Sequence, residues 1–139
     1  MDGKVKGLIK RHAEDEYPNE CCGILLGHKD EKTIAEIISA DNVDTDSKRN
    51  IHYAIDPLIL YRIEQESEKR GLDLIGFYHS HTDYPAILSK EDERYMIPGC
   101  IYAIASVDDG KCNELRCYYK NSFDEDYKDV TDTDYIKWR

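Results

Sequence analysis

The hydrophobic positions change their spacing along the chain, and each spacing predicts one type of element. Apolar residues recur at helical intervals over 4–16 and predict an amphipathic helix that ends at Pro18. The almost wholly apolar run over 21–27 predicts a buried strand, and 33–39 predicts a second strand. The chain therefore opens as a helix followed by a pair of strands.

The clearest helix of the pattern begins after Asp56. Asp56 can cap this helix, Pro57 suits its first turn, and Gly71 suits its end. The polar residues 41–48 before it predict a loop, and 50–55 predict a short extended segment.

The second half of the chain predicts strands around a histidine pair. Residues 72–78 predict a buried strand that leads directly into His79-Ser80-His81, while the acidic tail from Asn121 onward has no clear period. The elements between are a short helix over 89–96, an apolar strand over 101–107 and, across an Asp109-Gly110 turn, a strand over 114–119. The sum predicts an α/β fold, a single domain with a central mixed, largely buried β-sheet flanked by helices.

Charge and composition remove several classes of function. The 139 residues carry a formal net charge of -10, without a cluster of Lys and Arg, so nucleic acid is not an expected partner. The first ten residues lack the apolar core of a signal peptide, and no apolar run approaches the ~20 residues that span a bilayer. We therefore expect no membrane partner and a cytoplasmic location. The five cysteines include no CxxC pair and predict reduced thiols.

The histidine pair can direct two imidazoles at one point, because residues i and i+2 of a strand face the same side about 6.6 Å apart. That spacing suits a shared zinc ion, which in hydrolytic sites commonly has three protein ligands and a water. Asp92 is the nearest candidate for a third ligand, at the start of the short helix. Ser89 and Asp92 also match a capping box, which would only satisfy backbone amides.

Each part of this pattern has a structural alternative. Two histidines separated by one residue can also be a hydrogen-bonded core pair, and Glu20, just before a buried strand, can be an ordinary exposed acid. The complete string of His-Ser-His, seven residues, Ser89, two residues and Asp92, downstream of Glu20, favours a metal site. A carboxylate beside a metal can serve as general base.

This string resembles the signature of the JAMM, or MPN-plus, family of zinc metallopeptidases, a glutamate followed by H-[ST]-H-x7-S-x2-D. The resemblance implies an MPN-like (cytidine-deaminase-like) fold and zinc ligation by His79, His81 and Asp92. It also implies that Glu20 activates a zinc-bound water and that Ser89 assists the developing oxyanion. The length of 139 residues predicts a single domain over 1–139, and the resemblance covers its motif-bearing core at about 4–119.

Further residues resemble the small prokaryotic members of this family. Glu20-Cys21-Cys22-Gly23 with Gly27 is similar to their E-x-C-G-x-x-x-G stretch. The stretch YHSHTDYPAILS is similar to YHSHPDHPAxPS of hydrolases that remove cysteine from a sulfur carrier. Thr82 and Leu88 stand where relatives often have proline, so the rigidity of this loop and the subfamily stay open.

The resemblance implies an enzyme that hydrolyses a peptide or isopeptide bond at the C-terminus of a ubiquitin-like or sulfur-carrier protein, releasing cysteine in the latter case. A deubiquitinase-like isopeptidase and a non-catalytic MPN scaffold that binds protein partners are the alternatives. A homodimer is left open. His12, His28 and His52 lack partners at metal spacing, and Cys22 is expected to pack rather than to react.

Overall fold

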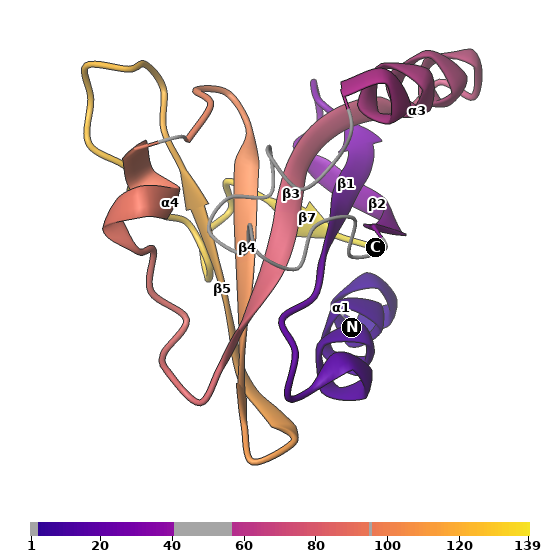
Figure 1. The fold of residues 1–139 in the computed structure, drawn as a ribbon. Coiled ribbons are helices and arrows are strands. Elements are labelled where there is room, and N and C mark those ends of the chain that lie inside the picture. The colour runs from indigo at the N-terminus through magenta and orange to yellow at the C-terminus, as the bar shows by residue number, and fades with distance from the viewer. Residues whose placement is uncertain (1–2, 41–56, 95) are drawn as a thin grey trace.

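The computed structural model describes residues 3–40, 57–94 and 96–139 (Figure 1). The expectations for 41–48, 50–55, His52 and Asp56 therefore fall outside the described residues. The helices are α1 (Gly3–Glu16), α3 (Pro57–Lys69) and α4 (Lys90–Arg94). The strands are β1 (Cys22–His28), β2 (Thr33–Ala40), β3 (Asp73–Thr82), β4 (Ile101–Asp108), β5 (Lys111–Tyr119), β6 (Lys128–Asp129) and β7 (Lys137–Trp138).

The strands form one mixed sheet in the order β6-β5-β4-β3-β1-β2-β7. The pairs β3–β4 and β2–β7 are parallel, and the other neighbouring pairs are antiparallel. The central strands β1 and β4 are buried along nearly their whole length, as expected for a sheet covered on both faces. The predicted α/β fold, with a mixed and largely buried sheet, is confirmed.

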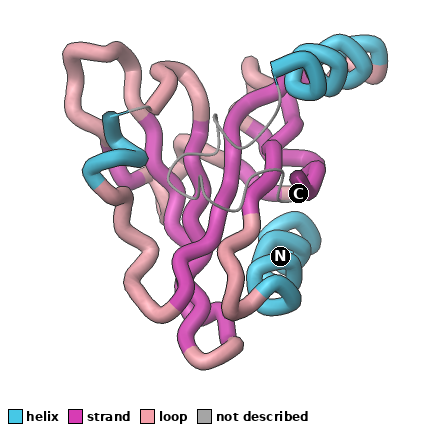
Figure 2. The backbone as a smooth tube through the Cα atoms, in the orientation of Figure 1, coloured by secondary structure: helices cyan, strands magenta, loops and turns pink. Residues whose placement is uncertain are grey.

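Helix α1 covers one face of this sheet, and the segment that carries α4 covers the other (Figures 1 and 2). Val5, Ile9 and Ala13 of α1 pack in the first core layer. Ala86, Leu88 and Met96 belong to the second layer, against which α3 also packs through its partly buried side chains. Because strand residues alternate between faces, β3 contributes to both layers.

The close approach of β1 to β3 explains one glycine of the motif. Gly23 pairs with Tyr78 across the two strands. A Cβ atom on Gly23 would lie 2.2 Å from the Tyr78 ring. The ring is fully buried, and its hydroxyl is hydrogen-bonded to Nδ1 of His12 on α1 at 2.8 Å. Glycine at this position therefore makes room for a tyrosine that joins the sheet to the helix.

Several elements differ in extent from the prediction. Strand β3 continues through the histidine pair to Thr82, and α4 is limited to Lys90–Arg94. The Asp109-Gly110 turn forms as predicted, with positive φ at both residues. The tail holds β6 and β7 on opposite edges of the sheet, but strands of two residues are too short to show a period in the sequence. In the described part of the chain, each helix is too short or too polar to cross a bilayer.

Candidate metal centre

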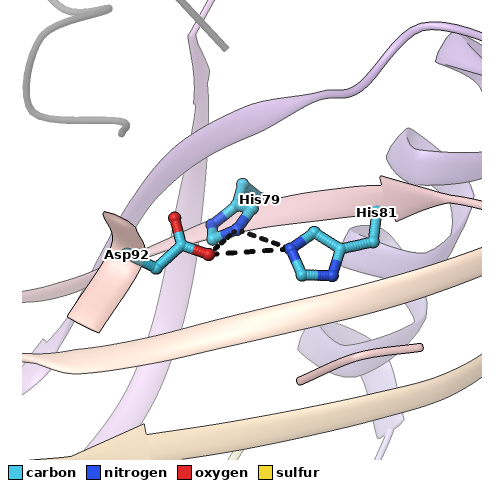
Figure 3. A group of neighbouring side chains, drawn as sticks. All are labelled: His79, His81 and Asp92. Atoms are coloured by element: carbon cyan, nitrogen blue, oxygen red, sulfur yellow. Dashed lines mark hydrogen bonds and ion pairs between the residues drawn. The ribbon is translucent and has the colours of Figure 1, made fainter. Parts of the chain in front are cut away.

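Three potential metal ligands converge on the face of the sheet opposite α1 (Figure 3). His79 and His81 project from β3, and Asp92 projects from α4. Nε2 of His79 lies 3.3 Å from Nε2 of His81. Oδ2 of Asp92 lies 3.4 Å from Nε2 of His79 and 3.7 Å from Nε2 of His81. The structure thus brings together the three residues that the sequence singled out.

The position of His81 determines which of its nitrogens can bind a metal. Nδ1 of His81 lies 2.7 Å from the carbonyl oxygen of Pro85. A carbonyl oxygen only accepts hydrogen bonds, so Nδ1 carries the proton and Nε2 of the neutral ring keeps a lone pair. That lone pair points toward Asp92, which offers a carboxylate oxygen. Such a cluster of acceptors is repulsive until a cation or a proton joins it.

The distances between the ligand atoms test whether a tetrahedral ion fits. Nitrogen and oxygen ligands lie about 2.0–2.1 Å from zinc, so two of them at a tetrahedral angle are about 3.3–3.4 Å apart. Two of the three separations, 3.3 and 3.4 Å, have this length, and the third is 3.7 Å. All three side chains are buried or nearly so, which limits the access of solvent to the ligand atoms. The donor set therefore suits a tetrahedral ion with one position left open.

Asp92 has two roles at once. Its backbone N–H donates to Oγ of Ser89 at 2.9 Å, and the backbone N–H of Ser89 donates to Oδ2 of Asp92 at 3.2 Å. This is the reciprocal capping box that the sequence offered as an alternative. Burial raises the pKa of the Asp92 carboxyl, but the imidazoles of His79 and His81, once protonated, stabilise the carboxylate more strongly and hold this pKa well below its usual range. The cap thus orients an ionised carboxylate toward the histidines.

Glu20 reaches the same site through the pairing of β1 with β3. Cys22 lies opposite His79 in this antiparallel pair, and Cys21 is hydrogen-bonded to Ser80, so Glu20 directly precedes the point where the two strands meet. The hydroxyl of Tyr84 donates to Oε2 of Glu20 at 2.9 Å. The ring of Tyr84 is stacked on the ring of His81, with centroids 4.1 Å apart and an angle of 13°. Glu20 is thereby connected to the ligand cluster.

Tyr84 was given no role from the sequence. Burial and the neighbouring carboxylate of Glu20 raise the pKa of its hydroxyl, so that the phenol is protonated at neutral pH and acts as a donor. The only signal in the sequence is an aromatic residue three positions after His81, which by itself is more typical of packing. The partner of Tyr84 lies 64 residues away, and spacing along the chain could not reveal it.

The loop after β3 is held without the proline that relatives often have at position 82. Asp83 has a positive φ of 64° and accepts hydrogen bonds from the Tyr17 hydroxyl at 2.9–3.0 Å and from the Asp109 N–H at 3.0 Å. Its own N–H donates to the carbonyl of Val107 at 2.7 Å. These bonds join the loop to the end of α1 and to the β4–β5 hairpin, so Thr82 does not leave it loose.

The remaining candidates lie apart from the ligand cluster. His12 is bonded to Tyr78 on the opposite face of the sheet, and His28 ends β1 far along the strand from His79. Burial raises the pKa of the Cys22 thiol to about 11, so the thiolate needed for a nucleophile is scarce at neutral pH. Cys22 packs in the second core layer, as expected from the sequence.

Curated relatives resemble most of this chain. A protein of Haloferax volcanii named desampylase is 35% identical over 109 residues, which cover 75% of this chain and 77% of that protein. A probable TtuB-protein conjugate cleaving protease of Thermus thermophilus is 30% identical, over 73% of this chain and 70% of its own. A CysO-cysteine peptidase of Mycobacterium tuberculosis is 27% identical, over 77% of this chain and 72% of that protein.

Solved structures share the fold. A protein from Desulfitobacterium hafniense has a TM-score of 0.76 at 23% identity, covering 99% of this chain and 90% of that one. A protein from Salinibacter ruber has a TM-score of 0.63 at 30% identity, covering 91% of this chain and 88% of that one. The family model described as prokaryotic homologs of the JAB domain matches residues 4–118. The resemblance to JAMM proteins is confirmed, and the chain belongs to the family of prokaryotic homologues of the JAB domain.

Proposed function

We propose that this protein is a zinc-dependent hydrolase that cleaves a peptide or isopeptide bond at the C-terminus of a ubiquitin-like or sulfur-carrier protein. The observation that carries the proposal is the convergence of His79, His81 and Asp92, and the hydrogen bond from Tyr84, whose ring is stacked on His81, to Glu20 supports it. The names of the relatives from Thermus thermophilus and Mycobacterium tuberculosis, a conjugate-cleaving protease and a CysO-cysteine peptidase, describe cleavage of the same kind.

His79, His81 and Asp92 are the proposed zinc ligands. Two imidazoles with one carboxylate favour zinc over magnesium and calcium, which prefer sites made of oxygen ligands. The ligand separations of 3.3–3.7 Å support a tetrahedral ion. The hydrogen bond from Nδ1 of His81 to Pro85 keeps the ring oriented for ligation. Zinc, when bound, lowers the pKa of water to about 7 and polarises a carbonyl oxygen.

Glu20 and Ser89 are the proposed catalytic residues. The Glu20 carboxylate takes a proton from the attacking water and returns it to the leaving amine. Ser89 is exposed, and its Oγ accepts the N–H of Asp92, so the hydroxyl proton is free to donate elsewhere. We infer that it donates to the oxygen on which negative charge develops during attack.

Two classes of substrate fit this chemistry. A ubiquitin-like protein joined to another protein is favoured by the relatives at 35% and 30% identity, named desampylase and conjugate-cleaving protease. A sulfur carrier that bears a C-terminal cysteine is the second class, supported by the relative at 27% identity. The converging ligand atoms argue against a scaffold that only binds partners, because such a scaffold has no need for a buried, repulsive cluster.

Intact-mass analysis can distinguish these substrates. The zinc-loaded protein and its Glu20→Gln variant are incubated with three substrates: an isopeptide-linked conjugate, a linear fusion at the same C-terminus, and a sulfur carrier with a cysteine adduct. Cleavage of at least one substrate by the unmodified protein alone is expected. If all three survive while zinc is bound, the proposed reaction is wrong.

We further propose that residues 1–139 form one domain that works in the cytoplasm without nucleic acid or membrane as partner. The net charge of -10 supports the absence of nucleic acid. A homodimer stays a prediction that sedimentation would test.

A further inference from the structure

Tyr84 lies between the proposed general base and one proposed metal ligand. Its hydroxyl donates to Oε2 of Glu20 at 2.9 Å, while its ring is stacked on the ring of His81 at 4.1 Å. One side chain therefore contacts both the group that would move the proton and a group that would hold the metal.

The backbone of Tyr84 is fixed from the sheet. Oγ of Ser106 on β4 donates to the carbonyl oxygen of Tyr84 at 2.6 Å. The preceding residue, Asp83, is bonded to Tyr17, Val107 and Asp109. The side chain of Tyr84 is 43% exposed, and a tyrosine on a free loop would lose rotamer entropy on taking one position. Here the anchored backbone and the stacked ring hold the hydroxyl in place.

Glu20 depends on such a partner. Its backbone lies just before β1, outside the hydrogen-bonded part of the strand, and its side chain is half-buried. In the described part of the chain, the hydrogen bond found for this carboxylate comes from Tyr84. A glutamate has three rotatable side-chain bonds, so without a donor its carboxylate would sample several positions.

We propose that Tyr84 is a positioning residue for the hydrolysis: it holds Oε2 of Glu20, so that Oε1 is the oxygen left to take the proton. This inference rests on the proposed function. Tyr84 itself transfers no proton in this scheme. Its hydroxyl keeps its hydrogen while Oε1 receives the proton of the attacking water and gives it to the leaving nitrogen.

The Tyr84→Phe variant removes the hydroxyl and keeps the ring on His81. A hydrogen bond to a charged group is stronger than one between neutral groups, and this one fixes the position of the Glu20 carboxylate. Its loss should therefore lower kcat by about tenfold or more. KM should change by less than about twofold, because the substrate does not bind through this bond. Zinc content should stay that of the unmodified protein. The matched control is Tyr61→Phe on α3, where the side chain is 61% exposed and kcat should be unchanged.

Two outcomes overturn the proposal. An unchanged kcat in Tyr84→Phe would show that the bond does not position Glu20, and a lower zinc content would assign Tyr84 to metal binding instead. In the Glu20→Gln background, the Tyr84→Phe change should cause no further loss of activity.

A double-mutant cycle on unfolding separates this inference from the proposed function. The unfolding midpoints of the zinc-loaded protein, Tyr84→Phe, Glu20→Ala and the double variant are measured without substrate. Non-additive shifts support the contact even if no conjugate is cleaved, whereas additive shifts remove its basis. Inactivity of the unmodified protein toward every conjugate would instead contradict the proposed function.

Discussion

Cys21 and Ser80 exchange two hydrogen bonds, and this exchange sets Glu20 beside the ligand strand. The N–H of Cys21 donates to Oγ of Ser80 at 2.8 Å, and the N–H of Ser80 donates to the carbonyl of Cys21 at 3.0 Å. Ser80 lies between the two histidines but points to the opposite face, where it is fully buried. The middle residue of the His-Ser-His string is thus structural, and it joins the proposed base to the proposed ligands.

Removal of this hydroxyl should weaken both the fold and the activity. In Ser80→Ala, the buried N–H of Cys21 loses its partner, so the free energy of unfolding should fall by about 1–3 kcal/mol. Turnover should fall as well, because Glu20 directly precedes Cys21. Ser80→Thr keeps a hydroxyl and should lose less of both. Urea unfolding and conjugate cleavage measure the two effects, and an Ala variant as stable as the unmodified protein would argue against the pairing.

Loss of a proposed ligand should release the metal. His81→Ala and Asp92→Ala each remove one of three convergent atoms, and we expect zinc content after dialysis to fall from about one ion per chain to a small fraction of that. His28→Ala is the matched control, because His28 lies at the far end of β1. Zinc measured by elemental analysis decides the matter, and full zinc content in Asp92→Ala would exclude that carboxylate as a ligand.

Gly23→Ala should destabilise the protein. The added Cβ would lie 2.2 Å from the ring of Tyr78, which cannot withdraw without breaking its bond to His12. Overpacking of this kind costs about 1–3 kcal/mol or more. Gly7→Ala on α1 is the control, and it should raise the stability rather than lower it. A Cβ added at Gly7 has no atom within 4 Å, and alanine should stabilise the helix by up to about 1 kcal/mol. Equal unfolding midpoints for the two variants would refute this explanation.

Acid should weaken the attachment of the tail. Burial raises the pKa of Asp129, but its bonds with Arg116 at 2.7 Å and with Thr131 outweigh burial and lower this pKa. A carboxyl whose pKa is lower in the folded state contributes stability above the unfolded value of about 3.9 and loses it as pH falls below that value.

The effect at Asp129 should be small and sensitive to salt. The pair is more than a third exposed on the aspartate side, so we expect a contribution of about 0.5 kcal/mol. The difference in unfolding free energy between the unmodified protein and Asp129→Asn should shrink between pH 5 and pH 3, because Asp129 takes up a proton as the pH falls. A difference that stays constant over this range would contradict the assignment.

The sequence predicted the parts of this site that are local along the chain. The histidine spacing on a strand and the serine-aspartate cap of a short helix follow from backbone periodicity, and the structure brings them together. The bond from Tyr84 to Glu20 could not be predicted, because it joins residues 64 positions apart through the register of β1 and β3. Strands β6 and β7 could not be predicted either. Each has only two residues and is defined by its pairing with a neighbouring strand, which the local sequence does not reveal.

The central claim is that three residues hold the metal while Glu20 moves the proton, and the Glu20→Gln variant tests it most directly. Gln has nearly the shape of Glu but cannot accept the proton. Zinc content and cleavage of a ubiquitin-like conjugate are measured on the same sample. The account predicts zinc equal to that of the unmodified protein, with turnover lower by about a hundredfold or more. Full turnover in this variant would contradict the claim.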